Sequence, residues 1–304
     1  MKNIIYLFVF MAFTCFCVSC GSYANLDLPD PDIKPVIQAY PTINECLKIS
    51  ITPSYSIMDY NNGLNEIILA EVDLFVNGNF EERLLCDGDF YHSTFIPKPD
   101  DTLRIEFINN AMAISSQTII PKPISIENHQ FSHNTFIDNY GDSFSELTVC
   151  FKDIRGEANF YEVLVFHTYY NEETREYKRS FPMEYKSRHP SILSEEILQY
   201  EPRSLLFNDH LFNTDSINIG FAFDRPYPSY PEKYCNSTIY LLHVTEAYYR
   251  YKQSYYKHLF LQTPTIWTGV NEPIPVETNI ENGYGVFAAY TLDTVTFVVP
   301  YYAN

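Results

Sequence analysis

The stretch AEVDLFVNGNF, residues 70–80, decides the fold class. Every second residue from Ala70 to Val76 is apolar, and a period of two is that of a β-strand with one buried face. Asn77-Gly78 follows at once, and this pair favours the two-residue hairpin turn in which both residues take a positive φ. The segment therefore predicts a β-hairpin with an apolar inner face.

The same alternation recurs along most of the chain. Further strand-like runs surround Ile105, Val149, Val163, Ile219, Leu241 and Phe297. Up to residue 122 the spacing of strands and turns is that of a small antiparallel sandwich, immunoglobulin-like or transthyretin-like, and the Pro121-Lys122-Pro123 segment is the best internal boundary. We therefore expect a mainly β chain, with an N-terminal β-sandwich over 36–122 and a C-terminal β-rich domain over 123–304.

One segment has a different pattern. Residues 245–261 contain neither Gly nor Pro and place Tyr248 and Tyr255 near helical spacing. Glu246 would lie in the first turn, where a carboxylate meets the positive end of the helix dipole. We expect one amphipathic helix over about 245–261, laid against the sheet, whose tyrosines pack rather than hold a cofactor. A second, shorter helix is expected within 191–200.

The N-terminus predicts a lipid anchor. Lys2 precedes an apolar run over 4–16, which is short for a membrane span but suits a signal peptide, here 1–19. Val18-Ser19-Cys20 resembles the cleavage site of bacterial lipoproteins, in which the thiol of the new first residue, Cys20, carries diacylglycerol. Cys17 and Cys20 also form a C-x-x-C, but a redox or zinc pair needs a folded context that a cleaved leader does not offer.

An extended tether is expected over residues 20–35. Alternating Asp and Pro between Asp27 and Asp32 favour a solvated, extended chain that holds the domain away from its lipid. A calcium loop is the alternative, but neither the turn glycine nor the closing glutamate of such a loop is present. The tether interpretation is therefore preferred.

Composition limits the partners. Hydrophobic residues make up 46% of the chain and aromatic residues 16%, with 26 Tyr and 23 Phe against one Trp, so a large core is available. The net charge of −18 disfavours nucleic acid and leaves membrane contact to the acyl chains. One stretch is locally basic and fits either a solvated surface or an anion site; it contains Lys178, Arg179, Lys186, Arg188 and His189.

Four cysteines follow Cys20 in the sequence. Cys46, Cys86, Cys150 and Cys235 lack the spacing of zinc ligands. An envelope location permits disulfides, but their pairing cannot be read from the sequence. Cys150 lies inside a strand-like run, which fits a buried free thiol equally well.

No catalytic, cofactor or metal site emerges from the motifs. Ser254 and Lys257 match S-x-x-K by letter only, since its companion motifs are absent, and G-x-S-x-G and H-E-x-x-H do not occur. His167 lies on a strand face and is expected to pack. Residues 282–285 fit a turn or close strand packing rather than a dinucleotide loop, and Asp209 fits a turn. We therefore expect a protein that is not an enzyme.

Four blocks carry a family resemblance. They are LTVCFKDIRGEANFYEV from Leu147, LLFNDHLFN from Leu205, TEAYYRYKQS from Thr245 and TNIENGYGVFAAY from Thr278. In this order, after a lipoprotein signal, they resemble the Bacteroidota lipoprotein family of domain of unknown function 4249. The resemblance implies an outer-membrane location and an accessory role beside a TonB-dependent receptor.

The sequence therefore predicts a lipid-anchored, non-enzymatic outer-membrane protein that assists a TonB-dependent receptor in nutrient uptake. A surface adhesin or envelope assembly subunit is the alternative, and an envelope hydrolase is a third. A ligand would be a small molecule, glycan or peptide, with the tyrosines of sheet edges and of 225–234 as stacking platforms. GSYAN after Cys20 leaves open which face of the membrane carries the protein.

Overall fold

The computed structural model describes residues 32–55, 67–212, 215–224, 231–262 and 274–299. The predicted signal peptide, Cys20 and nearly all of the tether lie outside these described residues. The strands are β1 Pro35–Ala39, β2 Lys48–Pro53, β3 Asp73–Val76, β4 Asn79–Arg83, β5 Leu85–Asp87, β6 Phe90–His92, β7 Thr102–Asn109, β8 Met112–Ile119, β9 Ile126–Ile137, β10 Ser143–Lys152, β11 Phe160–Asn171, β12 Glu176–Arg179, β13 Leu205–Asn208, β14 Ser216–Phe223, β15 Glu232–Val244, β16 Tyr284–Phe287 and β17 Tyr290–Phe297. The helices are α2 Pro190–Leu193, α3 Ile197–Tyr200 and α4 Glu246–Gln262.

The predicted hairpin is confirmed as β3 and β4. Asn77 and Gly78 have φ values of 51° and 82°, the combination that the two-residue turn requires. Val72 and Leu74 are fully buried on the inner face. Local sequence pattern and observed register agree here.

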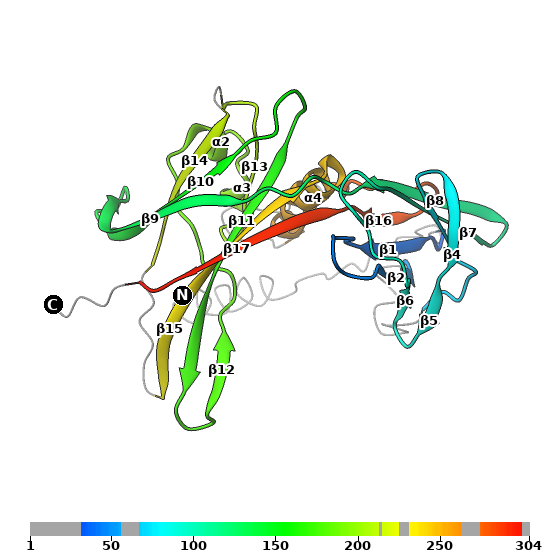
Figure 1. The fold of residues 1–304 in the computed structure, drawn as a ribbon, viewed down its shortest axis with the longest axis horizontal. Helices are drawn as coiled ribbons and strands as arrows, with labels where there is room; N and C mark the ends of the chain where they lie inside the picture. Colours follow the sequence, from blue (N-terminus) through cyan, green and yellow to red (C-terminus); the bar gives the residue numbers. More distant parts are fainter. Residues whose placement is uncertain (1–31, 56–66, 213–214, 225–230, 263–273, 300–304) are drawn as a thin grey trace, which may run out of the picture. The chain divides into compact units, whose positions relative to one another are not determined.

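Two sheets enclose the first core (Figure 1). One has the strand order β16-β1-β2-β6-β5, and the other has the order β4-β3-β7-β8. Ile37, Ile49, Leu74 and Ile105 are fully buried in the hydrophobic cluster that these sheets share. The mainly β fold predicted for this part of the chain is confirmed.

A second core lies between the sheet β14-β10-β9 and the sheet β12-β11-β15-β17, in which β13 also pairs with β11. The alternating residues of the predicted strands point into it, and Val149, Val163 and Ile219 are fully buried. All pairings within these two sheets are antiparallel. The period-two pattern therefore identified the inner faces correctly.

The first sandwich is completed by residues from the far end of the chain. β16 pairs with β1 in parallel, from Val36 opposite Tyr284 to Ala39 opposite Phe287. Phe287 is fully buried in the first core, and Ser115 Oγ donates to Glu281 at 2.8 Å. From Ile33 onward the chain groups as one unit. The domain boundary at 122/123 stays a prediction.

The long helix is confirmed as α4, and its Tyr248, Tyr249 and Tyr251 are buried. They pack with Leu242 and Val244 of β15 in a third hydrophobic cluster. The prediction of one short helix within 191–200 is wrong: α2 and α3 are separate single turns. Residue 196 between them takes a left-handed φ of 55°, which ends helical propagation.

Candidate functional site

A pocket of about 340 Å³ lies on the face of the β12-β11-β15-β17 sheet that carries α4. Its walls are mainly aromatic and aliphatic, with two cationic side chains. The lining residues are Tyr40, Leu164, Phe166, Arg179, Tyr240, Leu242, Tyr248, Lys252, Tyr290 and Leu292. Pockets for small ligands have this character, apolar walls with a few polar groups, and volumes from about 300 Å³ upward.

Strand alternation explains why these walls exist. Successive side chains point to opposite faces of a sheet, so Val163 and Val165 enter the core while Leu164 and Phe166 face the pocket. Leu164 is paired with Tyr240 of β15 in the strand register. The runs of apolar residues on these strands therefore line two surfaces, the core and the pocket.

Arg179 stands at the edge of the pocket. Its guanidinium lies 4.6 Å from the centre of the Phe166 ring and 5.7 Å from that of Tyr240, and Nη1 donates to the Tyr240 hydroxyl at 2.9 Å. Phe166 and Tyr240 in turn meet edge to face, with ring centres 5.1 Å apart. Among the described residues Arg179 has no carboxylate partner. Its charge is therefore held in place without being neutralised.

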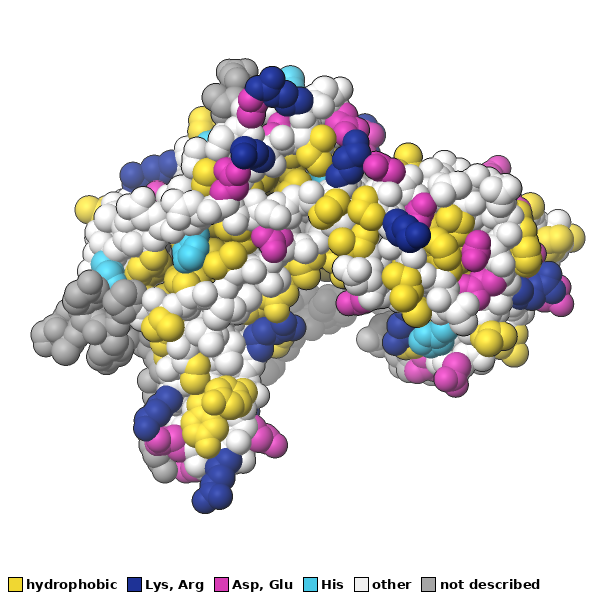
Figure 2. Space-filling model, viewed as in Figure 1, with side chains coloured by type: hydrophobic (Ala, Val, Ile, Leu, Met, Phe, Trp, Pro, Cys, Tyr) yellow, Lys and Arg dark blue, Asp and Glu magenta, His cyan; other side chains and the backbone are white. Residues whose placement is uncertain are grey.

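The remaining members of the basic stretch have other partners. Lys178 pairs with Glu232 at 3.6 Å and Lys186 with Asp138 at 2.5 Å. Arg188 donates to the Ile137 carbonyl, and His189 stacks on Phe212 with ring centres 5.0 Å apart. The structure thus separates Arg179 from neighbours that the sequence could not distinguish from it. Figure 2 shows hydrophobic side chains at the surface of the β12-β11-β15-β17 sheet, beside Lys and Arg side chains.

A buried carboxylate lies under the helix side of the pocket. Glu162 is 1% exposed, and it accepts hydrogen bonds from Ser204 Oγ and from the Tyr248 hydroxyl, both at 2.6 Å. Burial alone would lower the pKa of Lys252, but the Glu162 carboxylate and Tyr256 raise it above its ordinary value. Lys252 is therefore a cation, and its Nζ donates to the Tyr256 hydroxyl at 3.2 Å.

Three of the pocket tyrosines are held in the protonated form. Burial, followed by nearby charged or phenolic groups, raises the pKa of Tyr40, Tyr248 and Tyr290 above the usual value for tyrosine. Since no Asp or Glu is among the ten lining residues, the wall presents cations, neutral hydroxyls and apolar rings.

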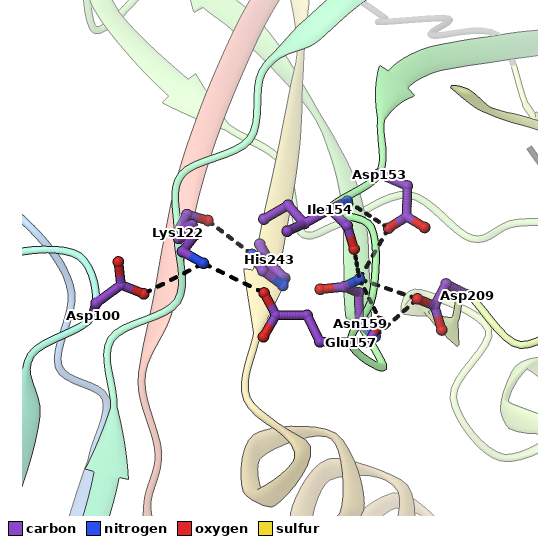
Figure 3. Close-up of polar contacts among 8 residues, drawn as sticks. All are labelled: Asp100, Lys122, Asp153, Ile154, Glu157, Asn159, Asp209 and His243. Carbon is purple, nitrogen blue, oxygen red and sulfur yellow. Dashed lines mark hydrogen bonds and ion pairs between the residues drawn. The ribbon is translucent and has the colours of Figure 1, made fainter. Parts of the chain in front are cut away.

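A separate polar cluster surrounds Asn159 (Figure 3). The Asn159 side-chain amide donates to Asp153 at 3.2 Å, to the Ile154 carbonyl at 2.7 Å and to Asp209 at 3.1 Å. The Asn159 backbone N–H also donates to Asp209, at 3.0 Å. These bonds fasten the turn before β11 to the segment after β13. Asp209 thus fixes a turn, and within the described ranges no group of three or more His, Cys, Asp or Glu could hold a metal ion.

The same region anchors Lys122 (Figure 3). His243 Nδ1 lies 2.8 Å from the Lys122 carbonyl oxygen. Thr291 Oγ1 also donates to that oxygen, at 3.2 Å. The Lys122 ammonium stands 3.8 Å from Asp100 and 3.5 Å from Glu157. Lys122, Asp100 and Glu157 each have a partner of opposite charge, so this cluster stabilises the fold.

His167 is buried, as predicted from its place on a strand face. It has no exposed surface, and its Nδ1 lies 2.6 Å from Ser237 Oγ. Ser237 is equally buried, so this serine and histidine cannot meet a substrate. Burial lowers the pKa of His167 from 6.5 to about 4, which keeps the ring neutral at pH 7.

We expect His167 to make stability depend on pH. Above pH 6.5 the ring is neutral in folded and unfolded chains; as pH falls toward 4, only the unfolded chain takes up the proton. The folded state should lose on the order of 3 kcal/mol in this window. His167→Gln should flatten the loss measured by denaturant unfolding at several pH values. Ser237→Ala keeps the imidazole and should retain the loss; an unchanged slope in His167→Gln would contradict the assignment.

The remaining sequence motifs are structural. Ser254 Oγ donates to the Tyr251 carbonyl and accepts from the Glu277 N–H, which leaves it inside the helix packing. The loop at 282–285 is confirmed as a turn leading into close strand packing, since Gly285 lies against the Ile37 backbone. Of the predicted stacking segment 225–234, residues 225–230 lie outside the described residues.

The four described cysteines are unpaired. Cys46 and Cys86 are exposed, while Cys150 is half-buried, with Sγ 3.3 Å from Ser216 Oγ. The sequence left disulfide and free thiol open for Cys150, and the structure has the free thiol. In the described part of the chain, no helix is both long and apolar enough to cross a membrane.

The fold and pocket define a mainly β chain with an aromatic, cation-bearing recess. The chain belongs to the family described as domain of unknown function (DUF4249), whose profile matches residues 24–296. The predicted family membership is therefore confirmed. No curated protein matches the chain.

Sequence reasoning missed most of the site, since it singled out only Arg179 and Tyr248 among the lining residues. Tyr40 and Lys252 were not singled out, and Glu162 lay unnoticed as the one charged residue in the run FYEVLVF. That acid was the available signal, because a carboxylate within a buried strand needs partners of its own.

Proposed function

We propose that this chain is a lipid-anchored, non-enzymatic binding module of the outer membrane that works beside a TonB-dependent receptor in nutrient uptake. The observation that carries the binding role is the aromatic pocket with Arg179 at its edge. A surface of this kind holds a ligand by ring contacts and one directed charge, and needs no reacting group.

The anchor is the second part of the proposal. The apolar leader and the Val18-Ser19-Cys20 site support lipidation of Cys20. An N-terminal residue that carries two or more acyl chains holds a protein stably at a membrane. The negative charge of the chain supports the same conclusion, since it disfavours attachment to anionic lipid by charge alone.

We expect Cys20→Ser to release the protein from the membrane fraction of the native host, because the substitution removes the thiol that accepts the lipid. The measurement is the share of the chain in washed membranes, with Cys46→Ser as the matched control. Cys46 is an exposed thiol within the folded domain, so its loss should leave the share unchanged. Equal retention of wild type and Cys20→Ser would overturn the anchor.

A further inference from the structure

We infer that the aromatic pocket binds a small organic carboxylate with a flat apolar body, and that Arg179 is the residue that recognises the carboxylate. This inference rests on the proposed binding function and names the ligand class for its site.

The charge balance of the pocket selects an anion of one charge. Lys252 is the second cation of the pocket; the buried Glu162 favours its charged form, and its Nζ donates to the Tyr256 hydroxyl at 3.2 Å. Arg179 has no acidic partner in the described part of the chain, and no carboxylate lines the pocket. Arg179 and Lys252 on the lining, counted with Glu162 behind Tyr248, therefore leave one net positive charge at the pocket, in a chain whose net charge is −18. A monocarboxylate neutralises it, whereas a dianion would bring an excess negative charge.

The geometry of Arg179 selects a carboxylate. One guanidinium N–H is used by the Tyr240 hydroxyl, at 2.9 Å, and the central carbon Cζ lies over the Phe166 ring, 4.6 Å from its centre. Arginine has five N–H donors in a rigid fork that matches the two oxygens of a carboxylate. The contact with the Phe166 ring and the Tyr240 bond thus prepare the fork for a ligand at little cost in side-chain entropy.

The body of the ligand follows from the walls. Phe166, Tyr240, Tyr40 and Tyr290 are half-buried, and Leu292 is 39% exposed. Apolar surface left open in this way is covered favourably by an aromatic or aliphatic ring. The volume of about 340 Å³ lies at the lower end of the range for ligand pockets, which favours a small molecule over a peptide or glycan chain.

Saturation-transfer NMR on the detergent-solubilised full chain tests this inference, with benzoate, benzamide and phenyl phosphate as probes. Benzoate should bind about tenfold more tightly than benzamide, since a charged hydrogen-bonded pair is worth a factor of this order. Phenyl phosphate should bind more weakly than benzoate. Equal affinity for benzoate and benzamide, binding of none of the probes, or preference for the phosphate would overturn the inference.

Variants assign the recognition to Arg179. Arg179→Met should weaken benzoate about tenfold and leave benzamide unchanged, and Tyr240→Phe, which removes only the bond that steadies the guanidinium, should weaken it less. Arg83→Met is the matched control, because Arg83 already pairs with Glu71 and Asp73 outside the pocket. Benzoate affinity unchanged in Arg179→Met would overturn the assignment.

The ligand class and the proposed receptor partnership can be tested separately, because a TonB-dependent receptor can be sought by recovery with the tagged chain. If the probes fail to bind as expected while the receptor is still recovered, only the ligand class is rejected. If benzoate binds but no receptor is recovered, only the partnership is rejected.

Discussion

Gly285→Ala should destabilise the protein by about 3–5 kcal/mol, the sum of backbone strain and overpacking. Gly285 has a φ of +92°, and an added Cβ would lie 2.0 Å from the Ile37 carbonyl oxygen and 2.9 Å from its carbon. These are backbone atoms of β1, so no side chain can turn away to make room. The substitution must therefore push β16 away from β1, with which it pairs in parallel.

Gly78→Ala separates the two causes. Gly78 has a similar φ of +82°, but a Cβ there would meet nothing within 4 Å. Its cost should be only the conformational strain, about 1 kcal/mol. The measurement is the free energy of unfolding in denaturant for both variants. Equal losses would show that the approach of β16 to β1 carries no energy of its own.

Glu162→Leu should cost about 3–5 kcal/mol of unfolding free energy, because it leaves two buried hydroxyl donors without their acceptor, at about 1–3 kcal/mol each. Leucine cannot accept the hydrogen bonds from Ser204 Oγ and Tyr248, each 2.6 Å from the carboxylate. It also leaves Lys252 without the negative charge that favours its protonated form. The two hydroxyl groups would then lack their acceptor, and Lys252 would keep only its tyrosine contacts.

Two further variants show which part of this cost is electrostatic. Glu162→Gln keeps an acceptor for the hydroxyl groups and should cost less, about 1–2 kcal/mol. The double variant Glu162→Leu with Lys252→Met removes both charges and should recover part of the loss, as a double-mutant cycle measures. Additive losses in the double variant would contradict a coupled Glu162 and Lys252.

Much of the fold could be predicted because its signals are local. The hairpin at 70–80 combines alternation with an Asn-Gly turn, and both features act within a few residues. Helix α4 was equally predictable, since a run without Gly or Pro and with tyrosines at helical spacing favours a helix over a strand or loop. The inner faces of β10, β11 and β14 followed from the same period of two.

Pairings across long distances in the sequence could not be predicted. Nothing in residues 36–39 indicates that 284–287 will lie beside them, since parallel pairing depends on the whole path between the two strands. The pocket depends on contacts between residues far apart in the sequence, because Tyr40 follows β1 while Lys252 belongs to α4. Arg179 likewise resembles Lys178 and Lys186 in the sequence; only the places of Glu232 and Asp138 make it different.

The most direct test of the central claim is recovery of partners with the tagged full chain from detergent-solubilised membranes of its host, identified by mass spectrometry. The proposed function predicts that a TonB-dependent receptor is recovered with the wild-type chain and is lost from the same preparation when Cys20→Ser releases the chain. Recovery of the anchored chain without any outer-membrane receptor, or with pilus or adhesin subunits in its place, would contradict it.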